Sequence, residues 1–151
     1  MITRTYIIPA ALTLILAFSL YQMLKPEPGA MQLLAADIYV VDGDTIRVGD
    51  DSIRLDGFNT PETRFAACER ERAMGIAARD RLQDLLNTAS EIRMVLTLTR
   101  SGTPARDKYR RLIGRLLLNG QDVADVLITE GYAEPYTGGQ RRSWCQGSET
   151  S

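Results

Sequence analysis

The sequence of 151 residues contains no histidine, only two cysteines (Cys68 and Cys145) and only two lysines (Lys25 and Lys108). Without histidine, proton transfer must use a carboxylate, lysine, tyrosine, thiol or water, which excludes histidine-dependent hydrolases. The common zinc sites are excluded too, because two cysteines are too few for a zinc cluster without histidine. The length is enough for one compact domain and too short for two.

The charge of the chain is balanced, since 18 basic and 19 acidic side chains give a net charge of -1 and a pI near 5.5. This composition argues against a generic nucleic-acid coat protein, which would be strongly basic. Nearly all of the positive charge is carried by arginine, whose planar fork suits bidentate contacts to phosphate or carboxylate. A local cationic site within a neutral protein is compatible with these totals.

The amino-terminal segment differs from the rest of the chain. Residues 6–24 contain no charge, follow Arg4 and end at Lys25. In a helix these 19 residues would extend about 28 Å, close to the hydrocarbon thickness of a bilayer, and no amphipathic period is visible. We predict a transmembrane signal anchor over 1–25. A cleaved signal peptide is the alternative, because Ala17-Phe18-Ser19 has small residues at the spacing of a cleavage site.

Either form of this segment would direct the remaining domain out of the cytoplasm, since Arg4 and the amino terminus would stay inside. We therefore expect a periplasmic or cell-surface protein. It would be tethered to the inner membrane by the anchor, or secreted if the segment is cleaved. The membrane is thus an expected partner, whereas no obligate protein partner is evident.

Beyond this segment, a short linker is predicted over 26–36 and one globular domain over 37–151. β-rich runs at 38–48 and 52–58 are joined by Gly49-Asp50-Asp51, which is typical of a hairpin connection. The later elements are a helix over about 68–87, strands over 91–99 and 111–118, a turn at Asn119-Gly120, and a short helix containing Val123, Val126 and Leu127 that Gly131 can end.

This pattern predicts a mainly β protein with helices, in the α+β class. Five short strands with one helix inserted and another after them are compatible with a small, partly open barrel of the OB-fold type. Other α+β arrangements fit the same periodicity, so the pattern alone does not choose the topology.

Three clusters of polar residues stand out: Asp42-Gly43-Asp44-Thr45, Arg54 with Asn59-Thr60-Pro61-Glu62, and Asp107-Lys108-Tyr109-Arg110-Arg111. Each has an ordinary structural interpretation when it is taken alone. Asp-Gly-Asp is often a turn, and an arginine between apolar strand residues can lie on a polar sheet face. Thr-Pro-Glu can begin a helix, and the last cluster can be a solvated run of charges.

Together the clusters favour chemistry on phosphate. A hard cation needs several oxygen ligands, which Asp42, Asp44 and the amide of Asn59 can supply together with nearby carbonyls. Attack on a phosphodiester builds charge on the equatorial oxygens, which two arginine forks can stabilise. A carboxylate can then orient and deprotonate water, the role that the absence of histidine leaves open.

The order and spacing of four blocks resemble the thermonuclease, or staphylococcal nuclease-like, family. The blocks are DGDTIRV at 42–48, IRLDGFNTPE at 53–62, DKYRR at 107–111 and NGQDVADVLITEGYA at 119–133, and the resemblance spans 39–136. It implies an OB-fold domain with a five-stranded barrel and inserted and C-terminal helices. It also implies a nuclease that uses calcium and water to cleave phosphodiester bonds of DNA and RNA, leaving 3′-phosphates.

By position, the resemblance implies a role for each matching residue. Glu62 matches the general base, and Arg54 and Arg111 match the two phosphate-binding arginines. The other matches are Asp44 as a calcium ligand, Thr60 as the source of a ligating backbone carbonyl, and Lys108 and Tyr109 as contacts to substrate phosphate.

Two positions depart from the family pattern. Asn59 stands where the best-known members have a calcium-ligating aspartate, so calcium should bind more weakly although the amide oxygen can still coordinate. Arg110 replaces the glycine that usually precedes the second arginine, which can change the backbone of this loop or add a phosphate contact. The tail YTGGQRRSWC also resembles that of exported bacterial members, with no implied catalytic role.

Cys68 opens the predicted first helix and Cys145 lies in the tail. A disulfide between them fits an oxidising location and would pin the tail to the domain. Two unpaired thiols are the alternative, which a cytosolic location would favour.

Three functions of different classes remain open. A metal-dependent nuclease explains why Glu62, Arg54 and Arg111 occur together, since a module that only binds has no physical need for all three. A catalytically inactive nucleic-acid-binding module is the alternative, because a neutral Asn59 can mark decay of the metal site. A purely structural envelope protein has the least support.

Overall fold

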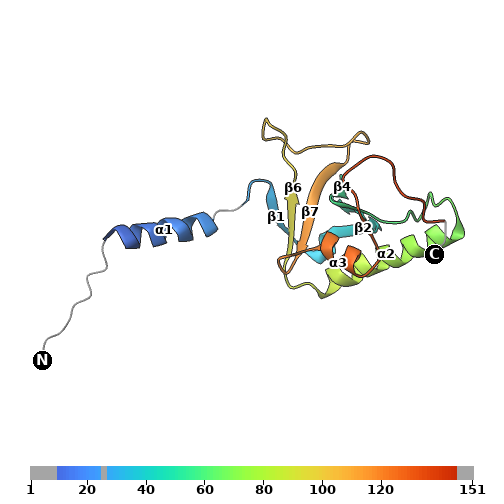
Figure 1. Cartoon of the computed structure of the whole chain (residues 1–151), viewed down its shortest axis with the longest axis horizontal. Helices are drawn as coiled ribbons and strands as arrows, with labels where there is room; N and C mark the ends of the chain where they lie inside the picture. Colours follow the sequence, from blue (N-terminus) through green and yellow to red (C-terminus); the bar gives the residue numbers. More distant parts are fainter. Residues whose placement is uncertain (1–9, 25–26, 146–151) are drawn as a thin grey trace, which may run out of the picture.

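In the computed structural model, residues 10–24 and 27–145 are described, and they form three α-helices, nine strands and one short 3-10 helix (Figure 1). The helices are α1 (Ala10–Leu24), α2 (Glu69–Thr88) and α3 (Val123–Thr129), and the 3-10 helix is η1 (Ala35–Asp37). The strands are β1 (Ala30–Leu33), β2 (Ile38–Asp42), β3 (Thr45–Val48), β4 (Asp51–Leu55), β5 (Phe58–Asn59), β6 (Ile92–Leu96), β7 (Leu112–Leu118), β8 (Gln121–Asp122) and β9 (Glu134–Pro135).

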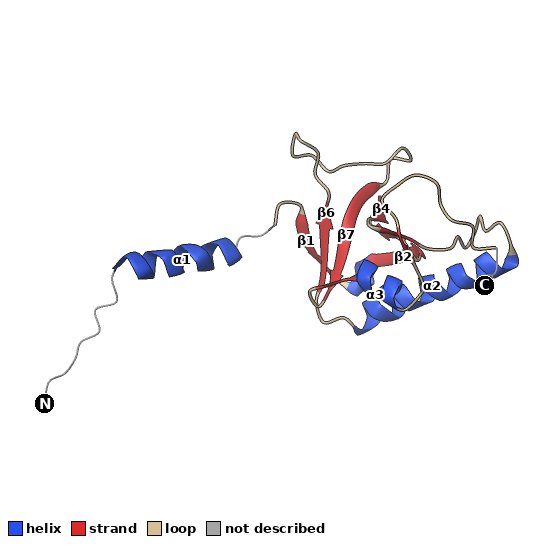
Figure 2. Ribbon diagram, in the orientation of Figure 1, coloured by secondary structure: helices blue, strands red, loops and turns tan. Residues whose placement is uncertain are grey.

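The main sheet of the described chain has seven strands in the order β1-β6-β7-β4-β3-β2, with β8 paired to β7. All pairs are antiparallel except β4 with β7, which run parallel. Figure 2 shows the strands of the domain on one side and α2 and α3 gathered along another. This mixed α+β architecture, a curled half-barrel sheet with helices, fits an OB-like fold and confirms the predicted α+β class. The predicted five-stranded barrel is corrected, because the short strands β1 and β8 also pair with the sheet and bring it to seven strands.

The core follows from alternating side chains on the strands. Along β7, Leu112, Gly114, Leu116 and Leu118 are buried while Arg115 between them is exposed, as the two-residue period of a half-buried strand requires. Gly114 is needed because a Cβ there would lie 2.8 Å from the carbonyl oxygen of Val95 in the neighbouring strand.

Helix α2 lies where a helix was predicted and covers part of the sheet by packing against β2. Ala78, Leu82 and Leu86 are fully buried at helical spacing, which accounts for its orientation. Its N-terminus is satisfied locally: the Cys68 sulfur accepts from the Glu71 N–H, and the Glu71 carboxylate accepts from the Ala67 N–H at 2.7 Å.

Helix α3 is capped by the Asp122 side chain at its N-terminus and is followed by a glycine, Gly131, after its C-terminus. The Asp122 carboxylate accepts a hydrogen bond from the Ala124 N–H at 3.0 Å. Gly131, with a φ of 79°, then reverses the chain after the helix, as the sequence predicted.

Two differences from the predicted elements concern the start of the domain. Residues 30–33, expected to belong to the linker, form strand β1, which pairs antiparallel with β6 from Ala30 opposite Val95 to Leu33 opposite Ile92. The run at 38–48 is not one strand but a hairpin, because the chain turns at Gly43 and Asp44 between β2 and β3. That turn carries the first polar cluster.

The predicted transmembrane helix is not supported. Within residues 10–24 and 27–145, no helix is both long enough and apolar enough to cross a bilayer. Helix α1 exposes large apolar side chains, among them Leu14, Phe18 and Leu20. The ends of the predicted segment, residues 1–9 and Lys25, lie outside the residues that the structure describes, as do residues 146–151 of the predicted domain.

Candidate active site

The three polar clusters meet at one cleft with a volume of about 1030 Å³. The first cluster lies at the β2–β3 turn, and the third lies in the loop before β7. The second cluster has Arg54 on β4, Asn59 at the end of β5 and its remaining residues directly after β5. The C-terminal tail closes another side. The charged and aromatic residues lining the cleft include Asp42, Arg54, Glu62, Lys108, Tyr109, Arg111, Tyr136 and Arg141.

Asp44 and Arg54 form a buried ion pair beneath the cleft. Arg54 Nη1 lies 3.0 Å from Asp44 Oδ2, and each side chain is only 10% exposed. The other Asp44 oxygen accepts from the hydroxyl of Thr45 at 2.9 Å. Because buried charges are tolerated only when paired and hydrogen-bonded, the two residues depend on each other.

The guanidinium of Arg54 is fixed by backbone carbonyls as well. Nη1 donates to the carbonyl of Leu55 at 2.8 Å, and Nη2 donates to that of Phe58 at 2.7 Å. Burial lowers the pKa of Arg54; the charge of Asp44 opposes this effect, and those of Arg141 and Arg111 add to it. Arg54 therefore holds the corner between β4 and β5 in place while presenting charge to the cleft.

Asn59 and Thr60 are almost completely buried beside this pair, with exposed fractions of 1% and 2%. The Thr60 N–H donates to Asp44 Oδ2 at 3.3 Å, which places the Asn59–Thr60 segment against the Asp44 carboxylate. Among the described residues, neither Asn59 Oδ1 nor Thr60 Oγ1 has a hydrogen-bond partner. Buried oxygens without partners are costly unless a further group binds them.

The unpartnered oxygens of Asn59 and Thr60 raise the question of whether the predicted metal ligands could bind a cation. Within the described part of the chain, no group of three His, Cys, Asp or Glu residues could hold a metal ion. The available oxygens are the Asp44 carboxylate, which accepts from the Thr60 N–H, and the unpartnered amide oxygen of the neighbouring Asn59, while the carboxylate of Asp42 accepts from the Thr63 hydroxyl. This oxygen-only set fits a hard cation such as calcium, with little ligand charge.

Gly43 and Gly75 allow this part of the chain to pack closely. A Cβ at Gly43 would lie 2.8 Å from Thr60 Cγ2 and 2.9 Å from Ala78 Cβ. A Cβ at Gly75 would lie 2.7 Å from the carbonyl oxygen of Glu62. The two glycines therefore let the β2–β3 turn and helix α2 approach the Asn59–Glu62 segment from two directions.

Glu62 lies at the cleft and is half-buried. Its Oε1 pairs with Nη1 of Arg141 at 2.5 Å, although 79 positions separate the two residues. The hydrogen bond and charge of Glu62 raise the pKa of Arg141 against the opposing effect of burial, which is the largest single influence on that group.

Arg111 is held by Asp107 in its own loop. Arg111 Nε and Nη2 lie 2.8 Å and 2.7 Å from Asp107 Oδ2, whereas Nη1 makes only a long hydrogen bond of 3.4 Å to Thr45 Oγ1. Burial alone would raise the pKa of Asp107, but the hydrogen bonds and charge of Arg111 outweigh it and lower this pKa. The Nη1 edge of Arg111 is thus the part best placed to contact another anion.

Arg110 keeps the backbone that a glycine would favour. Its φ is 67°, and its N–H donates to the carbonyl of Asp107 at 2.9 Å to close the turn. The Arg110 carbonyl accepts from Arg106 Nη1 at 2.8 Å. The loop therefore absorbs the strain of a non-glycine residue at this position and still presents Arg111.

Lys108 and Tyr109 lie at the rim of the cleft. Tyr109 is 66% exposed, and Lys108 Nζ lies 5.0 Å from the centre of its ring. The ring is also 5.5 Å from the guanidinium carbon of Arg111. This places two cations and an aromatic face at one edge.

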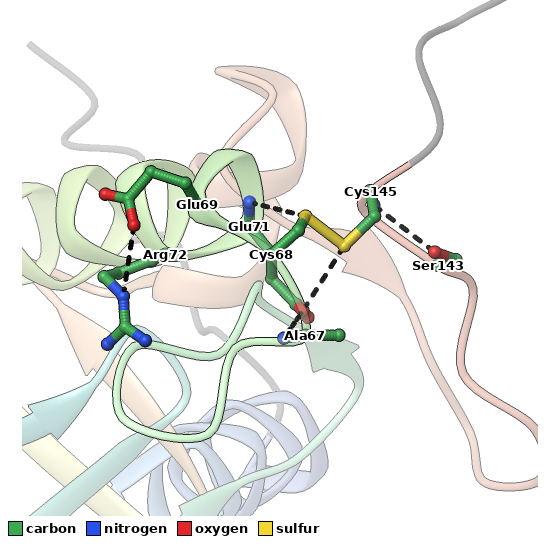
Figure 3. The surroundings of a disulfide bond; sticks show 7 residues. All are labelled: Ala67, Cys68, Glu69, Glu71, Arg72, Ser143 and Cys145. Atoms are coloured by element: carbon green, nitrogen blue, oxygen red, sulfur yellow. Dashed lines mark hydrogen bonds and ion pairs between the residues drawn. A yellow bond between two sulfur atoms is a disulfide. The ribbon is translucent and has the colours of Figure 1, made fainter.

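The structure joins Cys68 and Cys145 in a disulfide with a Cα–Cα distance of 5.9 Å (Figure 3). The tail before Cys145 has further anchors. Trp144 is buried, and Arg142 both stacks over its ring at 5.0 Å and pairs with Glu134 at 3.2 Å. Figure 3 shows the bridge joining Cys145 of the tail to Cys68, the residue directly before α2.

Arg141 is a charged cleft residue for which the sequence patterns predicted no role. The tail resembled that of exported family members, but no chemical role followed from its letters. Two adjacent arginines after Gly138-Gly139 and before Trp144-Cys145 were the available signal. A bridged tail brings its charges back to the domain, so a disulfide at Cys145 places the neighbouring arginine pair against the domain.

The protein is thus an OB-like α+β domain whose cleft is lined by arginines and carboxylates. The model of the staphylococcal nuclease homologue (SNase) family matches residues 52–148. The chain therefore belongs to the SNase family, whose members are nucleases, typically calcium-dependent. The match includes Arg54, Asn59–Glu62 and Arg111 and begins after the Asp42–Thr45 turn. No match was found among curated proteins.

Replacing Gly75 with alanine is expected to lower activity even though alanine favours helices. Intrinsic propensity would stabilise α2 by about 1 kcal/mol. The new methyl group would nevertheless collide with the Pro61 and Glu62 carbonyls and move Glu62. Steady-state kinetics and thermal unfolding check this expectation. In contrast, Ala77→Gly on the exposed face of α2 should cost about 1 kcal/mol of stability without changing kcat. Equal kcat in Gly75→Ala and wild type would contradict the role of this contact.

Proposed function

We propose that this protein is a metal-dependent nuclease that hydrolyses phosphodiester bonds of DNA, RNA or both. The observation that carries the proposal is the meeting of Glu62, Arg54 and Arg111 at one cleft. They come from three separate chain segments, and an ordinary fold has no need to bring them together. Membership of a nuclease family supports the same reaction.

In this proposal each group has a defined task. Glu62 accepts the proton of a water molecule that attacks phosphorus. Arg54, held rigidly by Asp44 and the Phe58 carbonyl, provides fixed positive charge beside the phosphate. Arg111 donates through its Nη1 edge while Asp107 keeps the rest of its guanidinium in place. Lys108 and Tyr109 contact a neighbouring phosphate from the rim.

A calcium ion is the proposed cofactor. Asp44, the unpartnered amide oxygen of Asn59 and the Thr60 carbonyl would hold it. When bound, such an ion supplies positive charge that favours a bound phosphate and lowers the pKa of a nearby water. Because the set contains one carboxylate and a neutral amide, we expect calcium to bind weakly.

The direct test uses the oxidised full-length chain. Single- and double-stranded DNA and RNA are incubated with calcium, magnesium or manganese, and the products are resolved by electrophoresis. We expect cleavage that needs the metal and stops on chelation. An inactive nucleic-acid-binding module is the alternative, and binding to these nucleic acids without turnover in any metal would establish it.

Changing Asn59 to aspartate is expected to strengthen calcium binding. It restores a negative charge beside Asp44, so the calcium concentration for half-maximal activity should fall by about tenfold. Without metal the new carboxylate is buried and unpaired, so the apoprotein should be less stable than wild type. Calorimetric titration with calcium and thermal unfolding with and without calcium measure both effects. Unchanged calcium affinity would remove Asn59 from the metal site.

We also propose that the domain works outside the cytoplasm, in the periplasm or at the cell surface. The Cys68–Cys145 disulfide supports this location, since such bridges persist in oxidising compartments. Fractionation of cells producing the tagged full chain, with thiol labelling of each fraction, tests it. Recovery in the cytoplasmic fraction with both thiols reduced would contradict it.

A further inference from the structure

The C-terminal tail reaches the cleft through Arg141. Arg141 Nη1 contacts Glu62 Oε1 at 2.5 Å, whereas Oε2 of Glu62 has no partner among the described residues. One carboxylate oxygen of Glu62, which lines the cleft, is therefore held by the tail, and the other is left without a hydrogen bond in the described part of the chain. This division suits a carboxylate that must hold one orientation while it acts on another molecule.

The same two chain segments are joined a second time by the disulfide. Cys68 follows Glu62 by six residues, and Cys145 follows Arg141 by four. At its other end the tail begins directly after β9, which pairs with β5 through Asn59 and Glu134. The segment that carries Arg141 is thus fixed at both ends, on either side of the ion pair.

Contacts within the tail also favour this position of Arg141. Its guanidinium lies 5.8 Å from the centre of the Tyr136 ring, and the Tyr136 hydroxyl donates to the carbonyl of Gly139 at 2.9 Å. Gly138 and Gly139 have φ angles of 109° and 96°, which a residue with a side chain rarely adopts. The turn that aims Arg141 therefore depends on the two glycines.

We propose that Arg141 is a positioning residue for Glu62 and that the Cys68–Cys145 disulfide holds it in that role. The proposal rests on the assignment of Glu62 as the general base. Arg141 binds Oε1 and so directs Oε2 to the attacking water. When the disulfide is reduced, one end of the tail is released, the ion pair is weakened and turnover falls.

The kinetic test separates this role from two others. Arg141→Ala should lower kcat by roughly ten- to a hundredfold, the loss expected for one hydrogen bond between charged groups, and leave KM within about twofold. Arg141→Lys keeps the charge and should recover part of kcat.

Arg79→Ala, which removes an exposed arginine paired with its neighbour Asp80, is the matched control and should leave both constants unchanged. A raised KM with normal kcat would instead make Arg141 a substrate contact. A raised kcat would make it inhibitory. Either result overturns the proposal.

The tether is tested by the Cys68→Ser, Cys145→Ser double variant. It should lose kcat in the same direction as Arg141→Ala, and adding Arg141→Ala to it should cause little further loss. Independent, multiplying losses would show that the disulfide acts elsewhere.

A measurement without turnover separates this proposal from the nuclease assignment. In the NMR spectrum of the oxidised protein, the Arg141 Nη protons should give distinct, slowly exchanging signals because the guanidinium is paired. Those signals should merge in Glu62→Gln and after reduction with dithiothreitol. If they persist after reduction, the tether is refuted even when the protein is an active nuclease. If they respond as expected but no nucleic acid is cleaved, the nuclease assignment fails and the role of Arg141 in catalysis fails with it.

Discussion

Replacing Glu62 with glutamine is expected to lower kcat by about two to four orders of magnitude, the contribution typical of a general base. Glutamine keeps the size and shape of the side chain but cannot accept a proton from water. Because it also loses the ion pair with Arg141, the tail near the cleft should become less ordered. Initial rates on a single-stranded oligonucleotide at saturating metal measure the effect.

The interpretation of this variant depends on its fold and on a matched control. Glu62 is half-buried and its ion pair is near the surface, so the unfolding temperature should stay close to that of wild type. Glu69→Gln changes another glutamate, exposed in the first turn of α2, and should retain full activity. A wild-type rate in Glu62→Gln would move the base to another carboxylate of the cleft, among them Asp42, Asp56 and Asp107.

Replacing Arg54 with alanine is expected to have the largest effect on stability. It leaves Asp44 buried without its partner and removes the donor to the carbonyls of Leu55 and Phe58. Breaking a buried ion pair in this way costs about 3–5 kcal/mol, a large share of the stability of a domain of this size. Urea unfolding measures the change, and activity should be lost as well.

Three companion variants show how much of that loss comes from leaving the buried Asp44 carboxylate unpaired. Adding Asp44→Asn to Arg54→Ala should recover part of the stability, because the carboxylate is no longer ionised and unpaired. Arg79→Ala breaks an exposed pair and should cost less than about 1 kcal/mol. A loss below 1 kcal/mol in Arg54→Ala itself would mean that the buried pair does not support the fold. Arg54→Lys keeps the charge without the fork, so it should be more stable than Arg54→Ala yet poorly active.

The elements with strong local signals were predictable. The helical spacing of buried residues in α2, the capping aspartate and terminating glycine of α3, and the alternation along β7 all act over short distances. Strand β1 was missed for the opposite reason. Its short segment follows a Pro-rich stretch, and it is a strand because β6 offers a free edge with which its backbone can pair.

For the apolar amino-terminal run, the sequence prediction and the described structure differ. Its residues predicted a membrane-spanning helix from hydropathy and length. The described part, α1, is a helix of 15 residues, and it does not reach the length that a bilayer requires.

The order of residues along the chain sets which side chains are available: arginines and carboxylates in ordered blocks, no histidine, and an asparagine at position 59. The sequence therefore predicts Glu62, Arg54 and Arg111 as site residues, because the order and spacing of the blocks can be read directly from the chain. How these groups pair with one another depends on the folded chain. The parallel alignment of β4 with β7 brings Arg54 and Arg111 to one end of the sheet, and the bridged tail sets Arg141 against Glu62 across 79 positions. Such contacts depend on how distant strands pair and on a disulfide between distant residues. The helical or strand periodicity of the sequence carries no information about either.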